Sequence, residues 1–595
     1  MAMNDSAENT EPRFRQKVFF WCWAAVSLVA LLGSNSLFWM EPRIAEAARE
    51  ITVTGRWYPL TVNFREYSGM PLLEVWSVAL IFEIGVSESA ARLPSALAAI
   101  ALLSGTWQLT KQLFGRRFAL LTGWLTLGSF GVLYMGRCCA PGMFSAAFAV
   151  WATVLYLRGV GRKSFWRALG LSALLALGVL NRGPGFLWLP GALLLPWMLT
   201  DRRPFDLRVA AGVAIAAAGL YLAWFFIFGE PVAALGGRLW RIAAEEGVPT
   251  AFRRWGKNWW NGRVNPVWTG FVDVPLVMMP WAPIMLAALV GALGRLRKLP
   301  RDEKCLLTGI LLGFLVLAFP ASSLRTDFLP LVPFLALETG VWALRGEEER
   351  LNRWAVAVTR TAIMTAASFA TVALVTIPVW SRMLNLTLPP LFWAAGFLFG
   401  ASVLAVMMLD SYPTQLLPRL TGLPEPLAAM VLGGTLASIC LISFLLPSLR
   451  ELREEKPFLL AVKRELAREK LKTIVDVGGV DSAALLLFYT DVSRPVATVS
   501  DRCDDDAVSE FVRAAAGAKD GRVAVIALYG DREQKFLRRC AEAAKLKIDV
   551  GKPDRLESVP SGCALFCRRS AFYLAEPAGG AGQSEESTNV RNKGI

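Results

Sequence analysis

The feature that most constrains this chain is a series of apolar runs, each about as long as a membrane-crossing helix. A transmembrane helix needs roughly 20 consecutive, mostly apolar residues. Hydrophobic residues make up 54% of the 595 residues and charged residues only 19%, which excludes an ordinary soluble domain of this size. The fold class we expect is a mainly α membrane protein with about thirteen transmembrane helices. The runs lie near 18–39, 91–110, 118–135, 142–158, 166–180, 184–201, 209–228, 273–294, 305–320, 327–344, 354–380, 389–409 and 427–446.

A shorter apolar segment, 71–86, decides the orientation of the chain. If it lies in the membrane interface, the basic loops fall on one side together with the N-terminus, and that side is cytoplasmic by the positive-inside rule. If it crosses the membrane, nearly all of these loops face outward. We therefore interpret 71–86 as interfacial. The basic loops are 111–117, 158–167, 202–208, 295–301 and 345–353.

This topology divides the chain into segments. Residues 18–39 lack a small-residue cleavage site after a short apolar core, which predicts a retained signal anchor and a cytoplasmic segment 1–17. The transmembrane domain covers 18–446, with outer loops 40–90 and 229–272. Residues 447–576 form a C-terminal periplasmic domain, and 577–595 are expected to be disordered. The predicted location is the bacterial inner membrane.

The amino-acid composition limits the kinds of reaction that this chain can catalyse. The chain has no His, which excludes His-based catalysis, haem ligation and ordinary zinc sites, so we expect no metal and no cofactor. The net charge of +15 comes from the short basic clusters between apolar runs, and we read it as a topology signal and not as a nucleic-acid surface. Any reaction must use carboxylates, Arg, Lys or the backbone.

The C-terminal region has the pattern of a small α/β domain. The segments "LKTIVDV", "ALLLFYT", "RVAVIALYG" and "CALFCRRS" are predicted strands, between helices such as 506–517 and 531–545. "DVGGVDS" is more typical of a strand-to-helix turn than of a phosphate-binding loop. The cysteines of this domain fit either a disulfide or buried free thiols. They are Cys503, Cys540, Cys563 and Cys567.

The first outer loop opens with the charged stretch "EPRIAEAAREI", residues 41–51. A helix from Pro42 places Ile44, Ala47, Ala48 and Ile51 on one apolar stripe and Arg43, Glu46 and Glu50 on the other side. One reading is an amphipathic helix on the membrane surface, held by Arg–Glu pairs. The other reading is a site for a lipid-phosphate donor and a hydroxyl or phosphate acceptor.

Basic residues predicted to lie on the outer side support the second interpretation, a site for a lipid-phosphate donor. An Arg at the outer end of a span is either a snorkelling anchor or a phosphate ligand, which the guanidinium suits through its bidentate fork. In the loop 229–272, Lys257 and its neighbours alternate with Trp residues, which fits an interfacial aromatic belt or a lid over sugar and phosphate. The outer arginines include Arg137, Arg182 and Arg325.

These segments together resemble a known family. "EPRIAEAAREI", "GRWYPL", "PLLEVW" and "GVSESAARLPSALAAI", followed by "LFGRR", "NRGPG" and "SSLRTDFLPLVPFLALETG", are similar to the aminoarabinose transferase and protein mannosyltransferase-like family of GT-C glycosyltransferases. The similarity covers about residues 30–345, and "ESAARLPSAL" is its most specific part. Thirteen spans with an outer C-terminal domain favour the aminoarabinose transferase branch.

The resemblance implies transfer of a sugar from a polyprenyl-phosphate carrier to an envelope acceptor, lipid A or another glycan or a protein. For a working enzyme of this kind we expect Glu41 as the catalytic carboxylate, with Glu46 or Glu66 nearby. The expected phosphate ligands are Arg43, Arg137, Arg182, Lys257 and Arg325. A carboxylate takes a proton from the attacking hydroxyl, while a cation neutralises the departing lipid phosphate.

The sequence departs from the family pattern at three places. Met40 stands where the family has the Asp of an Asp-Glu pair. Gly69-Met70-Pro71 replaces a Glu-Lys-Pro, and Pro141-Gly142 replaces a Pro-Asp. Two hypotheses follow: a working glycosyltransferase in which Glu41 takes the role of the Asp, or a non-catalytic relative that binds lipid phosphates or scaffolds envelope enzymes. A transporter fits less well, because the chain has no internal repeat and few ionisable residues within its spans.

Overall fold

The computed structural model places the chain in two compact units. The first comprises residues 1–33, 71–374 and 394–445, and the second 34–70, 375–393 and 446–595. The structure describes residues 14–34, 36–38, 40–67, 70–139, 142–159, 165–182, 184–200, 266–318, 325–345, 353–361, 416–423, 425–440, 455–478, 480–500, 503–518, 522–529, 531–548 and 569–577, with scattered positions from 364 to 401 and at 442–443.

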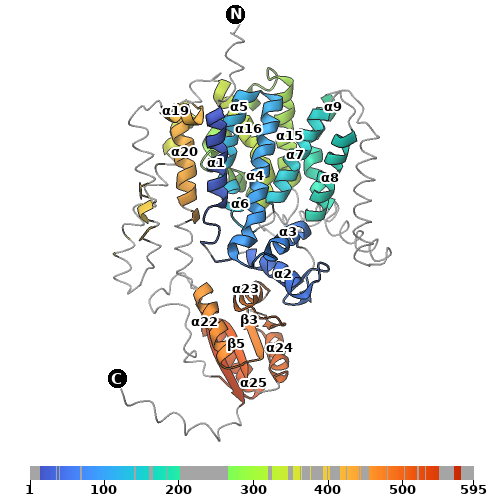
Figure 1. Ribbon diagram of the computed structural model, residues 1–595, viewed down its shortest axis with the longest axis vertical. Coiled ribbons are helices and arrows are strands. Elements are labelled where there is room, and N and C mark those ends of the chain that lie inside the picture. The colour runs from blue at the N-terminus through green and yellow to red at the C-terminus, as the bar shows by residue number, and fades with distance from the viewer. Residues whose placement is uncertain are drawn as a thin grey trace, which may run out of the picture. The chain divides into compact units, whose positions relative to one another are not determined.

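The first unit is a helical bundle, shown in Figure 1. Helix α4 packs against α5 and α7, α9 against α15, and α16 against α5 and α14. The elements are α1 (Phe14–Val29), α3 (Leu72–Phe82), α4 (Glu88–Leu113), α5 (Arg116–Gly128), α6 (Phe130–Gly136), α7 (Met143–Gly159), α8 (Phe165–Arg182), η1 (Pro184–Leu187), α9 (Trp188–Thr200), α13 (Pro266–Met278), α14 (Ala282–Gly294), α15 (Arg301–Ala318), η2 (Arg325–Leu331), α16 (Val332–Arg345), α19 (Leu416–Thr421) and α20 (Glu425–Cys440).

Aromatic side chains close the bundle where α1, α4 and α5 meet. The Phe20 ring meets the Trp124 ring edge-on, with ring centroids 5.1 Å apart, and it also lies against Trp107. Gly123 permits this approach, because a Cβ there would lie 2.9 Å from the Phe20 ring. Close packing of this kind fixes how these helices cross.

Helices occupy most of the predicted spans that fall within the described residues, but α1 ends at Val29, well before the predicted end of the first span at residue 39. Among those residues, no single helix is both long and apolar enough to cross a membrane. Two bent pairs meet that requirement by length and composition, α5 with α6 at 62° and Gly270–Met278 with α14 at 118°. The predicted span 209–228 and most of 354–380 and 389–409 lie outside the described residues, and the count of thirteen stays a prediction.

The segment predicted to be interfacial forms α3. This helix has 11 residues, which at 1.5 Å per residue span roughly 16 Å. That length is about half of the hydrocarbon core. A new helix, α4, begins at Glu88, where the Ser87 side chain accepts a hydrogen bond from the Ala90 N–H at 3.2 Å. The chain is therefore broken between the two helices.

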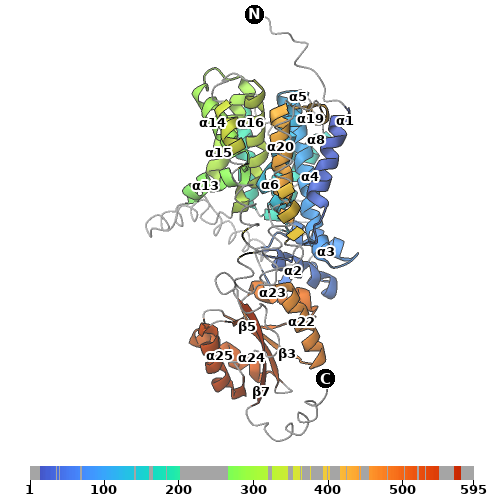
Figure 2. The same cartoon turned by 90° about the vertical axis from the view of Figure 1, so that its left-hand side faces the viewer.

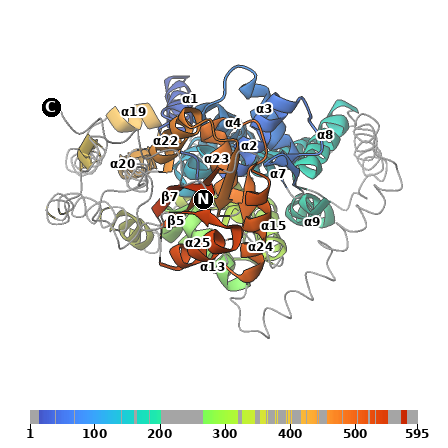
Figure 3. The ribbon, with the colours of Figure 1, turned by 90° about the horizontal axis from the view of Figure 1, so that it is seen from below.

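The second unit is a three-layer α/β structure. Its five-stranded sheet has the order β4-β3-β5-β7-β6, with β4, β3 and β5 parallel and β7 antiparallel to both β5 and β6. Helices α24 and α25 cover one face, and α22 and α23 lie on the other (Figures 2 and 3). Its elements are α2 (Glu41–Thr54), β1 (Thr61–Val62), β2 (Arg65–Glu66), α22 (Glu455–Arg468), β3 (Thr473–Val477), α23 (Val480–Thr490), β4 (Ala497–Val499), α24 (Asp505–Ala516), β5 (Val523–Tyr529), α25 (Asp531–Ala544), β6 (Leu546–Lys547) and β7 (Arg569–Pro577).

The structure corrects one strand prediction and confirms two others, while most of "CALFCRRS", with Cys563 and Cys567, lies outside the described residues. "ALLLFYT" is not a strand but the body of α23, whose residues from Ala483 to Thr490 are mostly buried. A helix buried on most sides has the same continuous apolar run as a buried strand, so the pattern alone cannot separate them. "LKTIVDV" and "RVAVIALYG" contain β3 and β5 as predicted, and "DVGGVDS" is the turn from β3 into α23. Cys503 and Cys540 are free thiols.

Candidate functional site

The charged helix α2, predicted to belong to the first outer loop, begins as the sequence predicts. Pro42 stands in its first turn, and Gly55 ends it in the left-handed conformation, donating its N–H to the Ile51 carbonyl at 2.8 Å. The buried Glu41 carboxylate accepts a hydrogen bond from the Phe38 N–H at 3.1 Å. An acidic side chain at this end of a helix is favoured by the helix dipole.

Arg43 is the predicted site residue of α2 that remains partly exposed. Its Nε and Nη2 donate to the two carboxylate oxygens of Asp481, the second at 2.6 Å, and its Nη1 donates to the Tyr67 hydroxyl at 2.9 Å. The hydrogen bond with Asp481 raises the pKa of Arg43 further. Arg43 is thus a permanent cation held in one orientation.

Glu46 and Arg49 form a buried ion pair inside the same unit. The Arg49 Nε and Nη2 donate to the two Glu46 oxygens at 2.8 and 2.7 Å, and the side chains are 2% and 0% exposed. Arg49 also donates to Asp491 at 3.2 Å and to the Val492 carbonyl at 3.0 Å. Burial raises the pKa of Glu46 to about 8, against the opposing effect of Arg49. Both Glu46 oxygens are therefore occupied by Arg49.

Glu50 is the third buried carboxylate of α2. It accepts hydrogen bonds from the Thr61 hydroxyl and from the Phe64 N–H, the latter at 3.0 Å. Burial raises its pKa, and these donors lower it in part. The helix therefore differs from the predicted amphipathic surface helix, because both its apolar stripe and its acidic side are buried. The charges can be buried because each has a charged or polar partner.

Two further links were not predicted from the sequence. The Asn63 side chain donates to the Val496 carbonyl and accepts from the Val496 N–H, both at 2.7 Å. The Leu37 N–H donates to the Tyr489 hydroxyl at 2.9 Å. The one sequence signal was Asn63 itself, since Asn tolerates the left-handed backbone that it adopts in the turn between β1 and β2.

Arg137 lies in the helical unit, buried at the end of α6. Its guanidinium donates to the Ser27 carbonyl at 2.6 Å and to the Leu31 carbonyl at 3.3 Å. The buried Arg92 donates to the next carbonyl, Leu32, at 2.7 Å. Both cations lie at the C-terminal end of α1, where carbonyl groups have no helical partner and the dipole favours positive charge.

The structure describes the remaining predicted residues only in part. Arg182 is the last residue of α8 and Arg325 the first of η2, while their side chains and all of Lys257 lie outside the described residues. Met40, at the position of the family Asp, directly precedes α2 and makes no side-chain cap. Of the other departures, Gly69 and Pro141 lie outside the described residues.

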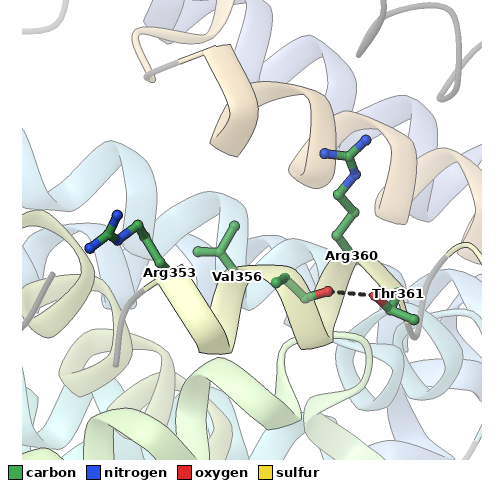
Figure 4. A pocket seen from close by; sticks show the side chains of 5 residues that line it. Arg353, Val356, Arg360 and Thr361 are labelled. Carbon is green, nitrogen blue, oxygen red and sulfur yellow. Dashed lines mark hydrogen bonds between the residues drawn. The ribbon is translucent and has the colours of Figure 1, made fainter. Parts of the chain in front are cut away.

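Figure 4 shows a separate cavity in the helical unit. The helical turns 353–361 line a cavity of about 450 Å³ with Arg353 and Arg360, and Val356 and Ala357 lie between them. The Thr361 hydroxyl donates to the Ala357 carbonyl at 2.8 Å. This cavity contains none of the predicted site residues.

The fold is that of the GT-C glycosyltransferases, which confirms the resemblance seen in the sequence. In particular it is similar to ArnT from Cupriavidus metallidurans. The structure of that protein bound to undecaprenyl phosphate aligns with a TM-score of 0.65 at 18% identity, covering 95% of this chain and 98% of ArnT. The apo structure of the same protein gives a TM-score of 0.65 at 18% identity, covering 94% and 98%.

The family model described as dolichyl-phosphate-mannose-protein mannosyltransferase matches residues 70–228. No curated protein matches the sequence significantly. The mainly α, multi-span membrane fold class predicted from the apolar runs is therefore confirmed by the ArnT-like architecture.

Proposed function

We propose that this protein is a membrane glycosyltransferase that moves a sugar from a polyprenyl-phosphate donor to an envelope acceptor. The acceptor is lipid A or another envelope glycan or protein, on the outer face of the bacterial inner membrane, and the C-terminal domain is periplasmic. The observation that carries the proposal is that Glu41 and Arg43 both lie in the first turn of α2, in a chain with an ArnT-like fold.

In this proposal the two side chains have complementary roles. Glu41 takes the proton from the acceptor hydroxyl while the acceptor oxygen bonds to the anomeric carbon of the sugar. The bond between that carbon and the phosphate oxygen breaks, and the polyprenyl phosphate leaves with the electron pair. Arg43 neutralises the charge that develops on the departing phosphate, which is the usual role of a positioned cation in such a transfer. Arg137, Arg182, Lys257 and Arg325 stay predicted phosphate ligands.

Within this proposal, Glu46 supports the site and does not act as a base. Both of its oxygens accept from Arg49, so a proton transfer through Glu46 would first have to break a buried ion pair. Glu41 is also buried, but it lies in the first turn of α2 with Arg43, and its carboxylate accepts a hydrogen bond from the Phe38 N–H.

The test is mass spectrometry of lipid A and other envelope glycans. Cells that lack the protein are compared with cells restored with the intact chain, with Glu41→Gln, or with the matched control Glu83→Gln, an exposed carboxylate of the same outer loop. We expect one sugar to disappear on deletion, to return with the intact chain and the control, and to stay absent with Glu41→Gln. Full activity of Glu41→Gln would remove Glu41 from the mechanism.

A second candidate function has its own supporting observation. Met40 stands at the position of the family Asp, and a thioether cannot accept a proton as a carboxylate does. A non-catalytic relative would bind lipid phosphates or scaffold other envelope enzymes. It would give no glycan difference on deletion, while the purified protein would still bind undecaprenyl phosphate.

A further inference from the structure

Residues 34–70 and the C-terminal α/β domain are parts of one compact unit. Residues of the loop are joined to residues more than 400 positions later through Leu37, Arg43, Arg49 and Asn63. Helix α2 packs directly on α23. The orientation of α2 is therefore set by the C-terminal domain and not by the loop sequence alone.

Arg43 is held most completely by this arrangement. A guanidinium has five N–H donors in a rigid fork. Two of them bind the two oxygens of Asp481 and a third binds the Tyr67 hydroxyl. By this count two N–H groups remain, on Nη1 and Nη2. Because the guanidinium is planar, the direction of these two groups is determined by Asp481 and Tyr67.

The pair with Asp481 is poorly suited to a purely stabilising role. The two side chains are 28% and 51% exposed, and ion pairs with this exposure typically contribute about 1 kcal/mol or less to stability unless their geometry is ideal. The bidentate geometry instead fixes orientation. Asp481 is itself located firmly, because it lies in the first turn of α23, where an acidic residue is favoured.

We propose that Asp481 is a positioning residue for the transfer site, which holds the Arg43 guanidinium so that its two remaining N–H groups face the phosphate of the lipid-linked donor. The C-terminal domain thereby completes a site whose reacting side chains lie in the first loop. This inference rests on the proposed function, since it assigns Arg43 to the donor phosphate.

The first experiment measures the position of α2 without using activity. Hydrogen–deuterium exchange of residues 41–54 is compared in the full-length protein, in Asp481→Asn, in the charge exchange Arg43→Asp with Asp481→Arg, and in Asp505→Asn. Asp505 is the matched control, because it forms an exposed ion pair with Arg539 in the same unit. We expect at least a fivefold faster exchange in Asp481→Asn, near-normal exchange in the charge exchange, and no change in the control.

The second experiment measures binding of undecaprenyl phosphate to the same purified proteins. We expect the dissociation constant to rise at least fivefold in Asp481→Asn and in the charge exchange, and to stay unchanged in Asp505→Asn. The charge exchange is the decisive variant, since it restores the link between the helices but moves the cation from α2 to α23, away from the position of Arg43. Recovery of both exchange protection and binding in that variant would overturn the proposal and leave a purely structural ion pair.

Different results refute the positioning role of Asp481 and the proposed function. Unchanged exchange and binding in Asp481→Asn, with normal binding by the intact protein, refutes the positioning role alone. Absence of undecaprenyl phosphate binding by the intact protein, together with no glycan change on deletion, refutes the proposed function and with it the assignment of Arg43.

Discussion

The substitution Asp476→Asn tests whether a buried carboxyl makes the α/β unit sensitive to pH. Asp476 lies in β3 and is fully buried. One of its oxygens accepts from the Ser482 hydroxyl at 2.9 Å, and among the described residues the other has no hydrogen-bond partner. Burial raises the pKa of Asp476 to about 7, partly offset by Ser482.

The size of the effect follows from this pKa. An Asp in the unfolded chain has a pKa of about 3.9, so the folded value is about three units higher, which corresponds to up to roughly 4 kcal/mol. The folded state holds the proton more tightly than the unfolded state. Stability from this group is therefore fully present below about pH 4 and is lost as the pH rises to about 7. Asparagine does not titrate and removes this dependence.

Hydrogen–deuterium exchange of β3 and β5 amides in the full-length protein measures the effect locally. Intact protein and variant are compared at each pH from 5 to 8, with Asp505→Asn as an exposed control. We expect the ratio of protection in Asp476→Asn to protection in the intact protein to rise steadily from pH 5 to about pH 7 and to level off above it. A ratio between variant and intact protein that stays constant across this range would show that Asp476 does not titrate as the structure implies.

Three further substitutions test contacts described above. Arg49→Met leaves the Glu46 carboxylate buried without its cation and should lower the free energy of unfolding by about 3–5 kcal/mol, measured by thermal unfolding. The double variant Arg49→Met with Glu46→Gln should recover much of this loss. An equal loss in the double variant would argue against the ion pair. Arg137→Met removes the cation from the C-terminal end of α1 and should lower the free energy of unfolding by about 1–3 kcal/mol in the same measurement. An unchanged midpoint of thermal unfolding would contradict the role of Arg137 as a cap of α1. Ser87→Ala removes the N-cap of α4 and should reduce the local stability of this helix end by about 1 kcal/mol. The loss should appear as faster hydrogen–deuterium exchange at residues 88–91. Unaltered exchange there would mean that packing alone holds this end of α4.

The local structure of α2 could be predicted from sequence, because its signals are local. Pro42 marks its start, and the spacing of Ile44, Ala48 and Ile51 indicates its buried stripe. The same spacing could not show that the acidic side is also buried. That depends on Asp491, Thr61 and the Phe64 N–H, and periodicity carries no information about partners on other elements.

In the C-terminal domain, too, some elements could be predicted from the sequence and others could not. The strands β3 and β5 follow from short β-branched runs bounded by turns, but α23 has an equally continuous apolar run and was assigned to the wrong class. The same holds for the residues of the candidate site, of which one could be predicted and one could not. Arg43 was predicted from the charge pattern of the first loop, whereas Asp481 was missed, because nothing in "DVGGVDS" indicates which cation it faces.

The link between Asn63 and Val496 has a consequence for how the protein is made. These residues are 433 positions apart, so at the usual synthesis rate of about 5–20 residues per second the first loop waits roughly 20–90 s for its partner. During that time Arg49 is without its contacts to Asp491 and the Val492 carbonyl, and Arg43 is without Asp481. The unit that contains α2 can therefore finish folding only after Val496 and the rest of its sheet have been translated. A nascent chain that stalls before α23 leaves the charged helix incomplete, however well the earlier helices have assembled.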